Sequence, residues 1–584
     1  MVHSHSFHPL TLACLGAIAL SGTAALAQQR PDSGTTQQQP ERQIQTLPEL
    51  VAPTVTTTLV KRAFVGGDVK VTPSGFRFTG NTLIPEAELQ AVVGGLIGKE
   101  VDFNGLADAA ASLRQLYTSK GYVLTDVYFP EQQFSAAGGI VEFAVIEARL
   151  GTVSVKVADG SGVSQAFATA LAKTYLVPGA LLSQGMLDKP VLLLRDMAGT
   201  DAEATVIPGA SPGEANVEIL VTPHGARYEP YVSADNMGAR SSGEYRVAVG
   251  VTVNAPLGMG DVLVARVQAA DRSGNPLYRL SYGLAVGNFG TKVAASYTEN
   301  EYVLGKQFAS LEASGRAKVG ALSLVHPLVR GRFTNLFATG SIENKDLTDV
   351  IAFPTETQTP TPTRSQKHIA MGRVGLLGNH SDLTLAGATT SFSLALAAGR
   401  LRLDATSASS DASVDGAHAA GNFEKLNAEL QRVQYLSQRS SVLLNLTGQY
   451  ASKNLTSAEK INLGGPTGVR GYPIGEGVGD VGVLATLEYR YQTSVKLGGE
   501  ALNLTAFYDY GSIRRDRVRN DATLKNTITT NSLSLDSVGI GVLLGREGNY
   551  LLTAALATRV GGPLPTTGDP DSRPRLWFLL QKWF

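Results

Sequence analysis

The most extensive pattern in this chain is an alternation of apolar and polar residues, which runs from about residue 226 to the end. Apolar residues occupy every second position in stretches such as Tyr245–Val253, Tyr278–Val286 and Leu426–Leu430. A period of two is typical of β-strands with one apolar and one polar face. Glycine, asparagine, aspartate and proline separate these stretches, so the pattern predicts a long series of strands joined by turns.

The length of this region and its final residues favour a transmembrane antiparallel β-barrel. Residues 226–584 accommodate about 16 strands at about 22 residues for each strand and its connection, within the range of membrane barrels. In the last stretch, RLWFLLQKWF, one face carries Leu576, Phe578, Leu580 and Phe584, although Lys582 interrupts it. The alternative is a secreted β-sandwich, which the number of alternating strands and the aromatic end of the chain disfavour.

Residues 71–225 combine helical and strand patterns, which predicts two small α+β modules, 71–149 and 150–225. In the first module the strand FRFTGN precedes two helical segments and the strands 122–129 and 140–146. The apolar residues expected on the two helical faces are Leu89, Val92, Val93 and Leu96, followed by Leu106, Ala110, Leu113 and Tyr117. The same order of elements recurs from Gly151, which indicates a tandem repeat.

The N-terminal residues predict export. Residues 1–27 contain the apolar run LTLACLGAIAL, which is too short to span a membrane, and end in the small-residue cleavage signature Ala25-Leu26-Ala27. They are therefore interpreted as a signal peptide, although no lysine or arginine precedes the apolar run. Residues 28–70 are rich in glutamine, threonine and proline, and are expected to form a flexible extension, either a linker or a plug.

Composition excludes several classes of function. Lysine and arginine number 50, as do aspartate and glutamate, so the chain has no net charge and no footprint for nucleic acid. The only cysteine, Cys14, lies in the predicted signal peptide, and the histidines of the mature chain are scattered. We therefore expect no metal, no cofactor and no disulfide. No other run of 18 apolar residues occurs, which leaves a barrel as the way for an apolar exported chain to use a membrane.

One loop is unusually rich in glycine and surrounds a single arginine: LGGPTGVRGYPIGEGVGD, Leu463–Asp480, with Arg470 near its centre. The spacing of Gly477, Gly479 and Gly482 fits a dinucleotide-binding fingerprint, which requires a helix to follow. The residues that follow alternate as a strand does, so this loop is not expected to bind a nucleotide.

Strand parity places one carboxylate inside the predicted barrel. Leu504, Ala506, Tyr508 and Tyr510 form an apolar face, so Asp509 between them points to the polar, lumenal side of the predicted barrel. A carboxylate inside a barrel requires a cation. Arginine suits the position because its planar fork can hold a carboxylate with two hydrogen bonds.

Several longer segments resemble one family. FTGNTLIPEAEL and LRQLYTSKGYVLTDVYFPEQQF are similar to a first POTRA domain, and LLRDMAGTDAEATVIPGASPGEANVEILV to a second, with Met197-Ala198-Gly199 where a Pro-Gly is usual. The stretch Ser233–Asp261 resembles a first barrel hairpin. Two short motifs are the loop motif Val469-Arg470-Gly471-Tyr472 and the strand motif Phe507-Tyr508-Asp509-Tyr510-Gly511. Together these segments resemble the TpsB family of two-partner secretion, of haemolysin-activator type, within the BamA-like superfamily.

The resemblance implies a location and a site. It implies periplasmic POTRA domains and a barrel in the outer membrane of a Gram-negative bacterium, inserted into lipid by the barrel-assembly machinery. It implies that the loop at about 451–479 folds back into the lumen and that Arg470 pairs with Asp509. Val469, Gly471 and Tyr472 would complete the loop motif, and Phe507 and Gly511 the strand motif.

The expected function is therefore a translocation pore. It would recognise a large TpsA-like exoprotein through its POTRA domains and export it unfolded. An assembly or insertion factor for other outer-membrane proteins is the alternative within the superfamily, and a passive porin is a further one. No catalytic dyad or triad is recognisable in the sequence, so an enzyme is not expected and no catalytic residue is assigned.

Overall fold

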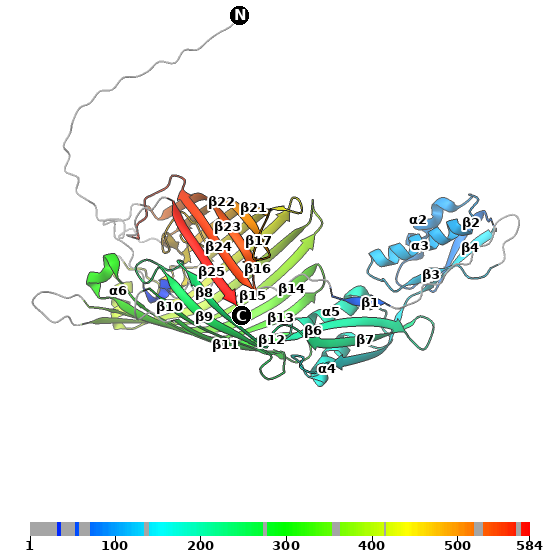
Figure 1. Cartoon of the computed structure of the whole chain (residues 1–584), viewed down its shortest axis with the longest axis horizontal. Coiled ribbons are helices and arrows are strands. Elements are labelled where there is room, and N and C mark those ends of the chain that lie inside the picture. The colour runs from blue at the N-terminus through cyan, green and yellow to red at the C-terminus, as the bar shows by residue number, and fades with distance from the viewer. Residues whose placement is uncertain are drawn as a thin grey trace, which may run out of the picture.

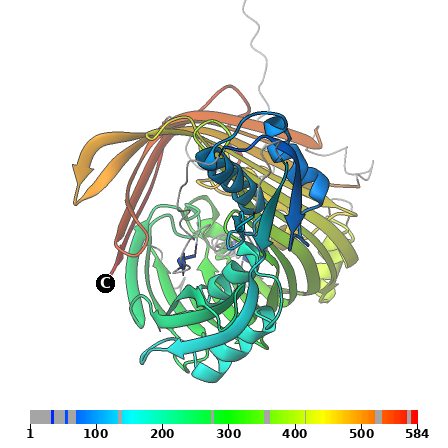
Figure 2. The same ribbon diagram turned by 90° about the vertical axis from the view of Figure 1, so that its right-hand side faces the viewer.

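A computed structural model describes residues 32–36, 53–57, 70–132, 139–271, 277–352, 362–413, 416–518, 530–567 and 574–584. The predicted signal peptide and most of the N-terminal extension lie outside these residues. The described part consists of a β-barrel and two small α/β modules that follow one another on one side of it (Figure 1). Figure 2 shows the two modules in front of the barrel.

The first module packs two helices on a three-stranded sheet of order β2-β4-β3. Its elements are β2 (Pro73–Thr79), α2 (Glu86–Val93), η1 (Gly94–Leu96), α3 (Phe103–Ser119), β3 (Asp126–Tyr128) and β4 (Gly139–Ile146). Leu89 and Val93 of α2 are buried in its core, but Val92 is exposed, so the expectation that it faces the core was wrong. At 100° per residue Val92 lies to the side of the face that the other two share.

The second module has the same order of elements and one additional strand. Its elements are β5 (Arg149–Val157), α4 (Gln165–Tyr175), α5 (Gln184–Arg195), β6 (Thr200–Pro208) and β7 (Glu214–Pro223). The additional strand, β1 (Val55–Thr57), comes from the N-terminal extension and gives a sheet of order β1-β6-β7-β5. Both helices begin at a serine, Ser164 or Ser183, whose side chain accepts the hydrogen bond of a first-turn amide.

The barrel is closed by 16 antiparallel strands, as the alternation predicted. They are β8 (Tyr228–Asp235), β9 (Arg246–Asn254), β10 (Val262–Ala270), β11 (Leu277–Val286), β12 (Thr291–Val303), β13 (Ser314–Arg330), β14 (Thr334–Ile351), β15 (Thr363–Asp382), β16 (Ala388–Leu403), β17 (Gly421–Tyr435), β18 (Ser440–Ala451), β21 (Val481–Leu497), β22 (Glu500–Arg514), β23 (Ser532–Arg546), β24 (Tyr550–Arg559) and β25 (Arg575–Trp583). Apolar residues such as Ile342, Val374 and Ile540 face outward and are exposed, whereas Lys345 and Asp509 face inward and are buried. This is the inverse of a soluble fold and fits a lipid-facing wall.

The first and last strands meet in a short seam. β25 pairs with β8 over five positions, from Leu579 opposite Asp235 to Trp583 opposite Tyr231. Beyond them the side chain of Asn236 continues the ladder, because its amide group donates to the Leu576 carbonyl and its oxygen accepts from the Phe578 amide. The backbone amide of Asn236 also donates to the Phe578 carbonyl, so backbone and side chain together extend the seam by one residue.

Two partly buried ion pairs fasten the second module to the barrel. Asp196, which follows α5, accepts two hydrogen bonds from Arg330 at 2.8 and 2.9 Å, and Asp188 within α5 accepts two from Arg332. Both arginines lie at the turn between β13 and β14. Met197, at the position where the sequence departs from the usual Pro-Gly, packs against Gly260 of the turn between β9 and β10. The module is thereby held on the rim from which these turns project.

Within the described ranges, helices are too short or too polar to cross a bilayer.

Candidate functional site: the re-entrant loop and its ion pairs

The connection between β18 and β21, residues 452–480, folds back into the barrel. It contains η3 (Ser457–Glu459), β19 (Ile461–Asn462) and β20 (Val478–Gly479), and the two short strands pair with each other. Leu463, Val469 and Tyr472 are fully buried in a cluster with inward-facing residues of the wall. β21 follows the glycines directly, so the helix that a dinucleotide site requires is replaced by a strand.

Arg470 lies between two carboxylates of the barrel wall. Its Nε and Nη2 atoms donate to the two oxygens of Asp509 on β22 at 2.9 and 2.8 Å, and Nη1 donates to Glu488 on β21 at 2.9 Å. The backbone amide of Arg470 also donates to Asp509, at 3.1 Å. Asp509 is 1% exposed and Glu488 is 7% exposed, so these charges are removed from bulk water and interact strongly.

The surroundings of the Arg470 pair hold both partners in orientation. Asp509 accepts further hydrogen bonds from the hydroxyls of Thr486 and Ser537, both at 3.1 Å. The guanidinium lies over the ring of Phe507, with its central carbon 3.2 Å from the ring centre. Trp577, on the last strand, donates from its indole nitrogen to the Arg470 carbonyl at 2.8 Å. Both oxygens of the Asp509 carboxylate thus accept hydrogen bonds from the loop and from the wall.

The other motif residues make room for the loop or fill it. A side chain at Gly471 would meet Ser537 and the backbone of β24, and one at Gly511 would meet Leu463 and Val469. Tyr472 donates to the Pro563 carbonyl in the last extracellular loop. Each of these motif residues therefore helps to hold the loop tip against the wall. The glycines do so because they have no side chain, which allows the two backbones to approach closely.

A second charge cluster holds the base of the loop. The Glu459 carboxylate accepts a hydrogen bond from Nζ of Lys425 on β17 at 2.6 Å, and Nζ of Lys345 on β14 lies 3.1 Å from its other oxygen. Glu459 is 1% exposed and Lys345 is also 1% exposed. Gln449 donates to the Glu459 carbonyl at 3.0 Å. Sequence analysis missed this cluster, because no local spacing connects residues on β14, β17 and the loop.

A short N-terminal segment, residues 32–36, rests against the same base. Asp32 accepts from Lys367 of β15 at 2.8 Å and from Ser457 of the loop at 2.5 Å. The Ser33 amide donates to Asp349 of β14 at 2.8 Å. Gly34 lies so close to the loop that a side chain there would meet Ser457 and Ala458. Residues 32–36 of the extension therefore lie inside the barrel and contact loop 452–480.

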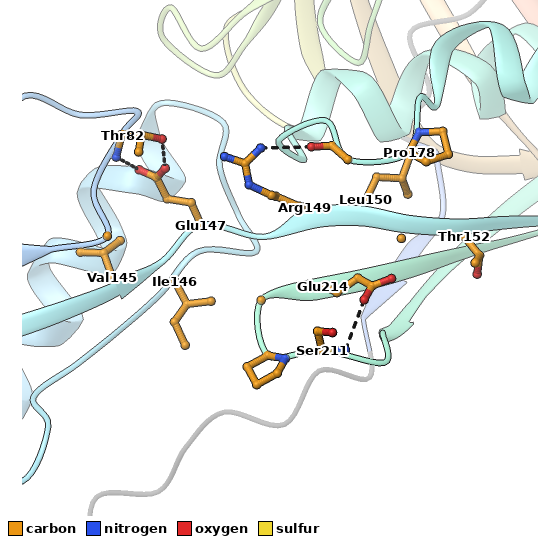
Figure 3. A pocket seen from close by; sticks show the side chains of 15 residues that line it. Thr82, Val145, Ile146, Glu147, Arg149, Leu150, Thr152, Pro178, Ser211 and Glu214 are labelled. Carbon is orange, nitrogen blue, oxygen red and sulfur yellow. Dashed lines mark hydrogen bonds between the residues drawn. The ribbon is translucent and has the colours of Figure 1, made fainter.

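A separate cavity of about 680 Å³ lies where the two modules join (Figure 3). Its polar side chains are engaged within the protein. Glu147 accepts from Thr82, Arg149 donates to the Gly179 carbonyl, and Glu214 accepts from the Ser211 amide. These bonds organise the junction of the modules. In the part of the chain that the structure describes, no group of three or more potential metal ligands was found.

The predicted site residues therefore lie together, and several further residues join them. Arg470, Asp509, Val469, Gly471, Tyr472, Phe507 and Gly511 all meet at the loop tip. Sequence analysis did not single out Glu488 or Trp577. Strand parity could have placed Glu488 on the lumenal face beside Asp509, since Tyr489 next to it faces outward.

Comparison with protein families identifies the chain. Residues 213–540 match the family described as haemolysin secretion/activation protein ShlB/FhaC/HecB, which is more than half of the chain. Residues 71–148 match the POTRA domain of ShlB type.

Relatives and solved structures agree with this assignment. The heme/hemopexin transporter protein HuxB of Haemophilus influenzae is 26% identical over 575 residues, which cover 98% of this chain and 97% of that protein. The outer membrane transporter CdiB of Dickeya dadantii is 21% identical, covering 68% of each. The structure of CdiB from Escherichia coli has the same fold, with a TM-score of 0.67, 17% identity and coverage of 94% of this chain and 98% of that one. The chain thus belongs to the ShlB/FhaC/HecB family and is an outer-membrane pore of two-partner secretion with periplasmic POTRA domains.

Proposed function

We propose that this chain exports one large TpsA-like exoprotein in an unfolded state and that the Arg470 cluster locks loop 452–480 in its export-competent position. In this proposal residues 71–149 and 150–225 recognise the exoprotein and residues 226–584 form the pore. Residues 28–70 would supply the segment at the loop base. The observation that carries the proposal is the contact of Arg470 with Asp509 and Glu488 in the lumen, where the loop lies in the path of an exported chain.

The lock is argued from the cost of breaking a buried ion pair. Removing one partner of such a pair costs about 3–5 kcal/mol, because the remaining charge is left without compensation. Here Arg470 holds both oxygens of Asp509, which is almost fully buried, and shares Glu488 with Arg490. The loop is therefore expected to occupy one defined position in the lumen rather than several.

The nature of the cargo is proposed from the relatives. HuxB, which matches along nearly the whole chain, is described as a heme/hemopexin transporter. We therefore propose an exoprotein that serves haem or haemopexin transport as the first cargo to test. The outward apolar wall would contact outer-membrane lipid, and the barrel-assembly machinery would insert it. The proposal assigns a transport role and no catalytic residue.

The test is the appearance of the exoprotein in the medium. The large exported protein encoded beside this chain is expressed with the wild type, with Arg470→Ala, with Arg439→Ala, or without this chain. Arg439 is the matched control, because it lies in an exposed turn between β17 and β18. We expect export with the wild type and Arg439→Ala, and a loss of export with Arg470→Ala although the barrel is still inserted.

Two results would contradict the proposal. Loss of the Arg470→Ala protein from the outer membrane would make Arg470 a folding residue. If deletion of the chain instead depleted many unrelated outer-membrane proteins, an assembly factor would be the better description.

A further inference from the structure

The edge of the second module is covered by a strand from outside that module. β1 (Val55–Thr57) runs parallel to β6, with Val55 opposite Ala204 and Thr57 opposite Val206 (Figure 1). The Ala204 amide donates to the Thr54 carbonyl at 3.0 Å. β1 is only three residues long, whereas β6 has nine. The covering strand is therefore held by few backbone hydrogen bonds.

The first module closes its own sheet edges with its own side chains. At the β2 edge, Gln90 of α2 donates to the Phe76 carbonyl at 2.7 Å. At the β3 edge, Arg114 of α3 donates to the Val127 carbonyl at 2.9 Å. Unpaired strand edges invite the addition of foreign strands, and such caps prevent it. Both caps belong to the folded module and remain when a partner approaches.

The β5 edge of the second module is closed in the same way. Gln165 of α4 donates to the Val155 carbonyl at 2.8 Å and accepts from the Val157 amide at 3.0 Å. The earlier part of β5 pairs with the segment 179–182, since Leu150 exchanges hydrogen bonds with Ala180 and Gly179. This edge too is closed by residues of the module.

The β6 edge differs because one part of it is covered by side chains of the module and the other part by β1. Around Ala202 it is capped by an ion pair of the module, in which Arg195 donates to the Ala202 carbonyl and Asp201 accepts from the Ala202 amide. From Ala204 to Val206 it is covered by β1. Among the described strand edges of the modules, this is the one closed by a segment that could leave without unfolding a module.

We infer that β1 is a placeholder and that the β6 edge from Ala204 to Val206 is the docking site for an extended segment of the exported protein, which displaces β1. The inference rests on the proposed export function. Addition of a strand to a sheet edge provides affinity through main-chain hydrogen bonds and specificity through alternate side chains. Val55 packs against the module core while Thr56 is exposed, so the incoming segment is expected to carry an apolar residue between small polar ones.

A disulfide that ties β1 to β6 tests the displacement. Thr56 and Thr205 are opposite one another, away from the core, and the predicted mature chain has no other cysteine. The variant Thr56→Cys/Thr205→Cys should export the co-expressed exoprotein when reduced. When the disulfide is formed, export of the exoprotein should fall to the level seen in cells that lack this chain.

The matched control ties the same residue to a neighbour within the module. Thr205→Cys/Glu218→Cys joins β6 to β7 on the same exposed face and leaves β1 free. It should export equally when oxidised and reduced. A photo-reactive residue in place of Thr205 should in addition capture the exoprotein during export.

The outcomes separate this inference from the proposed function. Export by the Thr56→Cys/Thr205→Cys variant with its disulfide formed would overturn the displacement of β1. Capture of the chain's own residues 53–57 alone during active export would overturn it as well. A wild type that exports nothing would instead contradict the export function itself.

Discussion

The tip and the base of loop 452–480 are held in the lumen by opposite arrangements of charge. At the tip the loop supplies a cation, Arg470, and the wall supplies two carboxylates. At the base the loop supplies a carboxylate, Glu459, and the wall supplies two lysines. Arg470 and Glu459 are thus each matched to wall residues of the opposite charge.

The two ends also differ in how strictly they fix geometry. A guanidinium donates in a rigid plane, so Arg470 can satisfy Asp509 with two parallel hydrogen bonds in one orientation only. A lysine ammonium is a point charge on a flexible stem, so Lys345 and Lys425 attract Glu459 without fixing its plane. The comparison teaches that the tip sets the orientation of the loop, whereas the base sets its position.

Inverting either charge should have the largest effect. Arg470→Glu would place three carboxylates together, and Glu459→Lys would place three ammonium groups together. Either change should raise the free energy of the seated loop by at least about 3–5 kcal/mol, because a buried charge loses its partner and gains a repulsive neighbour. The affected end of the loop should then leave its position in the lumen. Cleavage of the loop by protease added to intact cells measures the displacement.

Arg439→Glu, in the exposed turn, serves as the control for charge inversion and should leave the loop protected. Protection that persists in both inverted variants would show that packing of the apolar tip residues, rather than charge, holds the loop.

Substituting lysine for arginine at the tip, and arginine for lysine at the base, should affect export to different extents. Arg470→Lys keeps the charge but loses the fork, so export should fall by about tenfold, which corresponds to about 1.4 kcal/mol. Lys425→Arg keeps the charge where no fork is used, and export should change little. Quantifying the exoprotein in the medium tests both, and equal effects at the two ends would contradict the distinction between orientation and position.

The smallest effect is expected at the N-terminal segment 32–36, which contacts the wall and the loop near Ser457. Asp32→Asn keeps the shape of the side chain and removes its charge beside Lys367, at a cost on the order of 1 kcal/mol. The segment should leave the lumen more often, which ion conductance through the purified protein in a planar bilayer would detect as longer open periods. Unchanged conductance would indicate that the remaining contacts of residues 33–36 suffice.

Sequence reasoning reached the tip because its signals are local. Alternation on β22 placed Asp509 on the lumenal face, and the glycines around Arg470 marked an unusual loop. The number of barrel strands also followed from length and alternation.

The base and β1 were out of reach for a physical reason. Lys345, Lys425 and Glu459 come together only through barrel closure, so no window of sequence contains them. The three residues of β1 lie in a stretch rich in threonine and proline, and they form a strand only because β6 offers an edge. Tertiary context here overrides the local preference for an extended linker.

The seam between β8 and β25 makes the barrel wall uneven in its resistance to opening. Local unfolding begins where the fewest hydrogen bonds must break at once, and amide exchange follows that order. β8 and β25 are joined by five paired positions, by two flanking backbone hydrogen bonds and by the side chain of Asn236, whereas β14 and β15 are joined over eighteen positions. The barrel wall is therefore expected to open first at this seam, and the amides of Phe578, Leu580, Lys582 and Phe584, which alternate towards β8, should exchange with deuterium before the amides that join β14 to β15.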